Sequence, residues 1–148
     1  MVIGMSIERI VLDALEDGEG IVRLAPTWVP RSFLSPGKRL KLAPEDIYAL
    51  GAGRGGIDER WLASTTKADN PGAPEDEGLS YIVIQKESKI SRVLLKDAIN
   101  VLGEKFLGKE VIRKYGGWTV LAKLFDNSCP IPLHLHQIEE HARKVNKL

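Results

Sequence analysis

Hydrophobic positions near the start of the chain recur every three to four residues, the spacing that places side chains on one face of a helix. Ser6 precedes this pattern and has the side chain of a favourable N-cap. Asp17, Gly18 and Gly20 end it, and Ile21 to Leu24 follow as a short candidate strand. We therefore predict an amphipathic helix, with these apolar residues on its inner face: Ile7, Ile10, Val11, Ala14 and Leu15.

Residues 26–37 form a proline-rich arm, because Pro26, Pro30 and Pro36 cannot donate backbone hydrogen bonds and Gly37 follows them. We expect an ordered loop or an extended arm here, with no regular hydrogen-bonded element. The arm has too many apolar side chains for a solvated linker, so we expect it to pack against the protein or against another subunit. These side chains are Trp28, Val29, Phe33 and Leu34.

For the next forty residues, up to residue 78, the sequence pattern predicts little regular structure. Leu40 and Leu42 suggest a brief strand, and residues 44–50 a short helix with Pro44 in its first turn and Gly51 at its end. A glycine-rich loop follows. Residues 67–78 are too polar to bury, and we expect them to form a mobile loop.

The second half of the chain is predicted to alternate between strands and helices. Residues 79–85 form a dense β-branched and aromatic run, which predicts a buried strand. From Ser91 to about Phe106, apolar residues at helical intervals predict a well-buried helix. Residues 111–115 predict a short helix ended by Gly116 and Gly117, and residues 118–125 predict a strand. The fold class that follows is α+β, with a few helices and a small mixed or antiparallel sheet.

The composition of the chain indicates which classes of binding partner to expect and argues against nucleic acid and membranes. A chain of 148 residues with 43% hydrophobic residues fits a single domain, 1–148. With 21 basic and 20 acidic residues, the net charge of +1 gives no field that attracts nucleic acid or an anionic membrane. No apolar run reaches the roughly 20 residues of a membrane span. The single cysteine, Cys129, allows no intramolecular disulfide, so we expect a cytoplasmic protein.

The candidate chemistry lies near the C-terminus, where all three histidines occur. On a strand, His134 and His136 would share one face, while Leu135 would face the core. Glu140 follows four residues later and can supply a third ligand if the strand turns. A set of two histidines and one carboxylate suits a divalent metal such as Fe, Mn, Ni, Zn or Co.

This spacing resembles the first metal motif of the cupin superfamily, whose members fold as small β-barrels. Residues 118–141 resemble the first strands of such a barrel. Ser128 and Lys147 stand where the family has glycines, and the second motif with its further histidine is absent. Only eight residues follow Glu140. Because closing a barrel takes several more strands, the resemblance implies an incomplete barrel and a truncated relative of a longer ancestor.

A second resemblance concerns the middle of the chain, which is similar to a stretch near the front of mannose-6-phosphate isomerases. It implies a sugar-phosphate ligand and a metal that holds sugar oxygens while a base moves a proton between adjacent carbons. It identifies no catalytic residue in this chain, and activity need not have been retained. The residues that carry it are Gly55, Gly56, Ile57, Asp58, Glu59, Arg60, Trp61 and Ser64.

Other interpretations of the histidine segment remain open. Glu139 and Arg143, like Glu140 and Lys144, are spaced as ion pairs of a solvated helix. A zinc site built from Cys129, His134, His136 and His141 is also chemically feasible. A different class of function is a non-catalytic α+β domain that forms a homodimer through an exposed sheet edge and the proline-rich arm.

The glycine-rich stretch has two further interpretations. Gly51, Gly53 and Gly56 satisfy G-x-G-x-x-G, but a dinucleotide site also needs a strand before and a helix after them, so we predict a flexible turn. Arg54 and Arg60 could hold a phosphate. The tryptophans, which could stack on a sugar, are assigned to the core; they are Trp28, Trp61 and Trp118.

Overall fold

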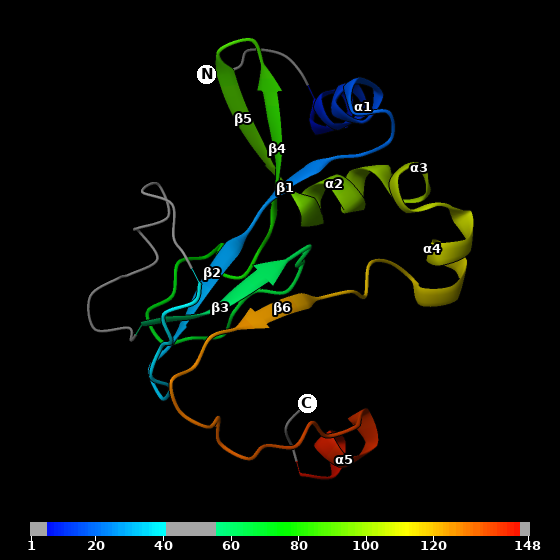
Figure 1. Cartoon of the computed structure of the whole chain (residues 1–148). Coiled ribbons are helices and arrows are strands. Elements are labelled where there is room, and N and C mark those ends of the chain that lie inside the picture. The colour runs from blue at the N-terminus through cyan, green and yellow to red at the C-terminus, as the bar shows by residue number, and fades with distance from the viewer. Residues whose placement is uncertain (1–5, 41–55, 146–148) are drawn as a thin grey trace.

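The computed structural model describes residues 6–40 and 56–145. Within them the chain forms five helices and six strands (Figure 1). None of these helices combines the length and the apolar character that crossing a membrane requires. In chain order the elements are α1 (Ile7–Asp17), β1 (Arg23–Ala25), β2 (Thr27–Arg31), β3 (Gly56–Leu62), β4 (Tyr81–Lys86), β5 (Lys89–Leu94), α2 (Leu95–Leu102), α3 (Glu104–Leu107), α4 (Lys109–Tyr115), β6 (Ala122–Phe125) and α5 (Glu139–Lys144).

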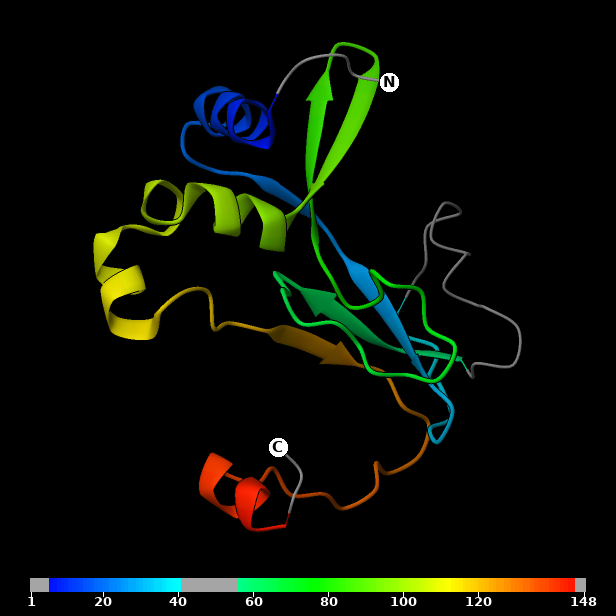
Figure 2. The same ribbon diagram turned by 180° about the vertical axis from the view of Figure 1, so that it is seen from behind.

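The strands form two separate three-stranded sheets, with the orders β1-β4-β5 and β2-β3-β6. Every strand pair is antiparallel, and neither sheet closes into a barrel. Helices α1 and α2 lie beside the first sheet, whereas the C-terminal segment and α5 lie beyond β6 of the second (Figures 1 and 2). The predicted α+β class with a small antiparallel sheet is therefore confirmed.

The larger hydrophobic core lies between α1, α2 and the first sheet. Val11 from α1 and Ile82 from β4 are fully buried in it, beside Leu95 and Ala98 from α2. The predicted N-cap is confirmed, because the Ser6 hydroxyl accepts a hydrogen bond from the Arg9 N–H at 3.3 Å. The buried strand expected over 79–85 is β4, and the helix expected at 111–115 is α4, which ends at a left-handed Gly116.

Strand β5 corrects the helix expected from Ser91. Residues 89–94 pair with β4 in a hairpin, and helix α2 starts only at Leu95. The hairpin turn holds Glu87 at a φ of 53°, where glycine or asparagine is the usual residue. No Asn-Gly or Asp-Gly pair marks the turn in the sequence, and this is why the hairpin was missed.

The proline-rich arm contains a strand, contrary to the expectation of an irregular segment. Strand β2 accommodates Pro30 because its register with β3 shifts between Val29 and Pro30, the irregularity at which a strand tolerates a missing N–H. Trp28, Val29 and Leu34 are buried within the chain itself, while Phe33 is 64% exposed. The arm is thus largely part of this chain's own core.

Strand β3 was also missed, because the expected glycine-rich loop runs directly into it. The loop at 67–78 has no helix or strand, as predicted, but Ala68 and Glu77 are buried, so the expectation that it is too polar to bury was wrong. Leu40 belongs to no strand. Several expectations lie outside the described residues. They are the brief strand at Leu42, the helix at 44–50, and the interpretations of Gly51, Gly53 and Arg54.

A buried carboxylate ties the end of β6 to the arm. Asp126 accepts hydrogen bonds from the backbone N–H groups of Arg39 and Leu40, the latter at 2.6 Å, and from Arg39 Nε at 2.9 Å. The Gly37 N–H donates a hydrogen bond to the backbone carbonyl oxygen of Asp126 at 2.5 Å. The Leu40 N–H, followed by the Arg39 side chain, holds the pKa of Asp126 below its ordinary value. The aspartate therefore stays charged and keeps residues 37–40 in place.

A substitution at Gly37 tests this attachment. A Cβ at position 37 would lie 1.8 Å from Asp126 Oδ1, which already accepts a hydrogen bond from Arg39. We predict that Gly37→Ala lowers the free energy of unfolding by roughly 1–3 kcal/mol, the usual cost of overpacking. Urea unfolding followed by tryptophan fluorescence measures it. Gly117→Ala is the matched control, because a Cβ there meets nothing within 4 Å. Equal stability of both variants would contradict the prediction.

Candidate functional site

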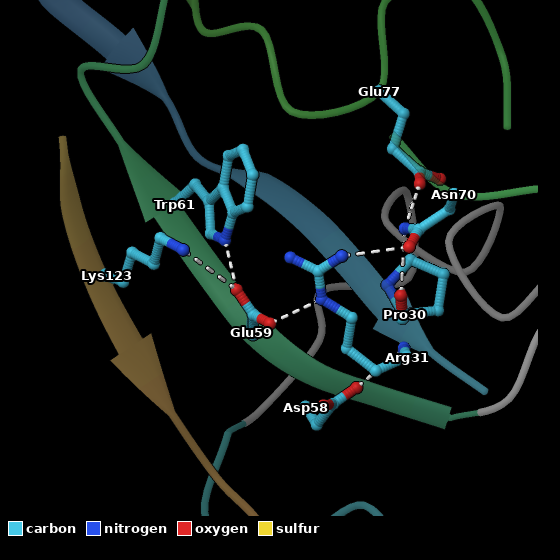
Figure 3. A network of polar contacts seen from close by, with 8 residues as sticks. All are labelled: Pro30, Arg31, Asp58, Glu59, Trp61, Asn70, Glu77 and Lys123. Carbon is cyan, nitrogen blue, oxygen red and sulfur yellow. Dashed lines mark hydrogen bonds and ion pairs between the residues drawn. The ribbon is translucent and has the colours of Figure 1, made fainter. Parts of the chain in front are cut away.

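One face of the second sheet carries a charged network (Figure 3). Glu59 and Trp61 lie two residues apart on β3 and so share a face. On β6, Phe125 pairs with Glu59 and Lys123 with Trp61. Because directly paired residues of an antiparallel sheet lie on the same side, all four side chains belong to one surface. Arg31, at the end of β2, joins it.

The buried carboxylate of Glu59 is the centre of this network. Arg31 Nε and Trp61 Nε1 each donate a hydrogen bond to it at 2.6 Å, and Lys123 Nζ lies 3.6 Å from its second oxygen. The two cations also lie over the Trp61 ring, with Lys123 Nζ 4.6 Å and Arg31 Cζ 5.7 Å from its centroid. A buried carboxylate is stable only when it is paired. Glu59 has partners on three strands, namely β2, β3 and β6.

Asn70 fixes the position of Arg31 from the loop at 67–78. Its side-chain oxygen accepts a hydrogen bond from the second guanidinium nitrogen, Nη1, at 2.9 Å. Its amide nitrogen donates to the Pro30 carbonyl at 3.0 Å and to Glu77 at 2.8 Å. The Arg31 side chain, only 17% exposed, is therefore held at two of its three nitrogens (Figure 3).

The histidine segment is an extended coil that carries two imidazoles side by side. The ring centroids of His134 and His136 lie 5.3 Å apart, with their planes at 78°. His134 Nδ1 lies 3.1 Å from the Pro132 carbonyl oxygen. Because a carbonyl can only accept, Nδ1 is the donor of this hydrogen bond, and in the neutral imidazole Nε2 then keeps its lone pair. A histidine oriented in this way is prepared to ligate a metal.

The histidine segment and the charged face of the sheet enclose one pocket of about 300 Å³. This volume is at the lower end of the range of about 300–1,000 Å³ that small-molecule sites occupy. Its wall thus combines two imidazoles, two cations, one paired carboxylate and two phenyl rings, one of which is Phe33. The residues that supply them are Arg31, Glu59, Lys123, Phe125, His134 and His136.

Several details of the predicted metal site need correction. No strand forms at residues 134–136, and Leu135 is 89% exposed, so it does not face the core. Glu140 lies on α5 and binds Lys144 Nζ at 2.6 Å, while Glu139 pairs with Arg143. The structure thus has the solvated helix that was the alternative interpretation. Within residues 6–40 and 56–145, no three histidine, cysteine or acidic side chains converge on a point where a metal could bind.

Sequence reasoning brought the two histidines together but missed the rest of the pocket. Glu59 and Trp61 belong to the stretch similar to the isomerases, although no role was assigned to them, and Trp28 and Trp61 are core residues as predicted. Arg60, considered for phosphate binding, stacks over Trp28 with its Cζ 5.2 Å from the ring centroid. No family model, curated protein or solved structure matches the chain.

Asp58 differs sharply from its neighbour Glu59. It is fully buried, and only one of its oxygens is paired, by the Arg31 N–H at 2.9 Å. The other oxygen has no hydrogen-bond partner among the described residues. Loss of hydration on burial, reinforced by the charge of Glu59, raises the pKa of Asp58 from 3.8 to about 6. The folded protein therefore binds a proton at this carboxyl group more tightly than the unfolded chain does.

This raised pKa makes stability depend on pH. Because the folded pKa exceeds the unfolded one, Asp58 contributes most stability below about pH 4 and loses that contribution as the pH rises through about 6. We predict that Asp58→Asn raises the free energy of unfolding by about 1–3 kcal/mol at pH 7 and flattens its decline between about pH 4.5 and 7. Urea unfolding across this range measures the effect, with the exposed Asp69→Asn as control. A parallel decline in both variants would refute the assignment.

Proposed function

We propose that the chain is a cupin-type, metal-dependent protein similar to sugar-phosphate isomerases, with a divalent metal held by His134 and His136 at the edge of the 300 Å³ pocket. The observation that supports this most is the proximity of the two imidazoles to the cations Arg31 and Lys123 in that one pocket. A phosphorylated sugar would be bound by both parts, since a metal held by the imidazoles can bind its hydroxyl oxygens and the cations can bind its phosphate. The exposed thiol of Cys129 fits a reducing compartment, so we propose the cytoplasm as its location.

The spacing of the rings supports joint ligation. Imidazole nitrogens bind zinc at about 2.0–2.1 Å in tetrahedral geometry, which places two ring centres about 5 Å apart. The observed centroid distance is 5.3 Å. The spacing of the two ring centres therefore fits a chelating pair, and the hydrogen bond from His134 to Pro132 favours the tautomer with Nε2 as ligand.

Glu140 remains our proposed third ligand, although it now binds Lys144. Both side chains of that ion pair are well over half exposed. Exposed pairs of this i,i+4 type contribute only about 0.3–0.5 kcal/mol to stability. The ion pair is therefore too weak to keep the carboxylate from a metal held four residues away along the chain.

The pocket wall suits a phosphorylated sugar. Arg31 and Lys123 carry two positive charges against the single negative charge of Glu59, so the wall attracts an anion. Arginine and lysine are the usual ligands of a phosphate group. A bound metal would act as a Lewis acid on sugar oxygens, as in aldose-ketose isomerisation.

Metal titration tests this proposal. We expect the protein, purified without a histidine tag, to bind about one equivalent of Zn²⁺ or Co²⁺, and His134→Ala or His136→Ala to abolish this binding. Glu140→Gln should weaken it at least about tenfold, since metal affinity depends on each ligand and its supporting groups. Isothermal titration calorimetry and elemental analysis measure both effects.

The chain offers close controls for each variant. Glu139→Gln also removes an i,i+4 ion pair on α5, and His141→Ala also removes an exposed histidine of that helix. Both should bind metal as the wild type does. Cys129→Ser should also leave binding unchanged, whereas its loss would favour the zinc set that includes this cysteine. Metal-loaded protein should convert mannose 6-phosphate to its ketose isomer, and binding without conversion would limit the proposal to a metal-binding relative.

Self-association is a second candidate, favoured by the exposure of β6. Among the described strands, β6 is an edge of its sheet and pairs with β3 alone. Its Leu124 and Phe125 are about half exposed, and the unpaired backbone of such an edge can add a strand from a second copy. The proline-rich arm, which is largely buried in its own chain, contributes only Phe33. We therefore propose a homodimer that forms through β6.

Light scattering at micromolar concentration measures this association. We predict that wild-type protein is a dimer and that Leu124→Lys makes it a monomer, because a charge on the edge strand opposes pairing. Ile21→Lys is the matched control, since Ile21 is a 77% exposed isoleucine outside this edge. A monomeric wild type, or two monomeric variants, would argue against an interface at β6.

A further inference from the structure

A second pocket, of about 380 Å³, lies between the helices, away from the histidines. Helix α2 with Gly103 after it, and α4 with the segment that follows it, supply most of the wall, and Thr65 after β3 completes it. No residue of this pocket belongs to the histidine pocket. Trp118 Nε1 donates to the Ala63 carbonyl at 2.7 Å, which attaches the segment after α4 to the end of β3. The pocket therefore has a fixed wall.

The polar groups of this second pocket are available to a ligand. Lys96 and Asn100 are four residues apart on α2 and so lie on one face of that helix. Neither side chain, nor the hydroxyl of Thr65, makes a hydrogen bond or ion pair with any residue in the described part of the chain. Three donors of different kinds are thus left without a protein acceptor.

Glycines leave the remaining wall open. Gly103, at the end of α2, and Gly116 and Gly117, after α4, line the pocket, and a Cβ at any of them would meet nothing within 4 Å. The Gly117 N–H donates to no acceptor within the described ranges. A ligand can therefore approach the peptide groups closely, as glycine-lined sites allow.

The charges and shape of the pocket define the ligand class. Lys96 is its only ionised residue, so the wall is positive, and Ile99, Ile112 and Trp118 provide an apolar side. A phosphate monoester accepts hydrogen bonds at its three terminal oxygens, the wall offers ammonium, hydroxyl, amide and peptide donors, and lysine binds phosphate as a point charge. We propose that this pocket binds a small organic phosphate monoester, with the phosphate at Lys96 and the organic part against Trp118.

Titration with phenyl phosphate, followed by amide and indole NMR signals, tests this site. We expect saturable shifts of Gly117 and of the Trp118 indole in wild-type protein. Lys96→Met keeps the exposed aliphatic stem but removes the charge, and should weaken binding about tenfold, as expected for a lost charge-assisted hydrogen bond. Lys109→Met, which removes an exposed lysine of α4 outside the pocket, should bind as the wild type does.

Other results would overturn the inference. These are absent shifts at Gly117 and Trp118, equal affinity of Lys96→Met and wild type, or equal affinity for phenol, which has the ring but no phosphate. The His134→Ala, His136→Ala double variant should retain the shifts. This inference does not depend on the metal proposal, because the two pockets share no residue.

Discussion

The second sheet depends on the pairing of a buried charge at its centre, the carboxylate of Glu59. Desolvating a carboxylate costs several kcal/mol unless partners compensate, and here Arg31, Trp61 and Lys123 supply them from three adjacent strands. The same contacts hold both cations over Trp61, and Arg31 is further fixed by Asn70. The requirement to satisfy one charge therefore determines where the positive groups of the histidine pocket lie.

Two neighbouring carboxylates on β3 behave differently because the register shift leaves Asp58 without a partner on β2, whereas Glu59 pairs with Val29 and Phe125. Glu59 faces two cations and an indole N–H, so its burial is compensated. Asp58 faces the other side, where the Arg31 N–H pairs with one oxygen only, and its pKa rises to about 6. The strand thus contains a stabilising and a destabilising buried acid in succession. An exchange of their environments by a one-residue register slip would break the charged network, so the network also specifies the register.

Local patterns predicted what local interactions determine. Helices α1 and α4 follow from periodic apolar residues and from caps at Ser6 and Gly116, all within one short window. Strand β3 could not be found this way, because its Asp58, Glu59 and Arg60 look like a solvated run and are explained only by partners on β2 and β6. The same holds for the pocket. The i,i+2 spacing indicated that His134 and His136 lie together, whereas Arg31, Glu59 and Lys123 meet only through strand pairing across 92 residues.

The C-terminal segment at residues 131–136 has the sequence pattern of a strand but forms none in the structure. Its sequence alternates, with apolar residues at 131, 133 and 135 and histidines at 134 and 136, which is the pattern of a strand with one buried face. Yet Leu133 and Leu135 are almost fully exposed, because no neighbouring strand covers them in the described structure. A strand that paired with this backbone would lie beside the segment, and the alternation of side chains would put the leucines on one face and the histidines on the other. Metal binding by the two histidines, as proposed, would therefore use one face of this segment and leave its leucine face open, separate from the β6 edge proposed for association.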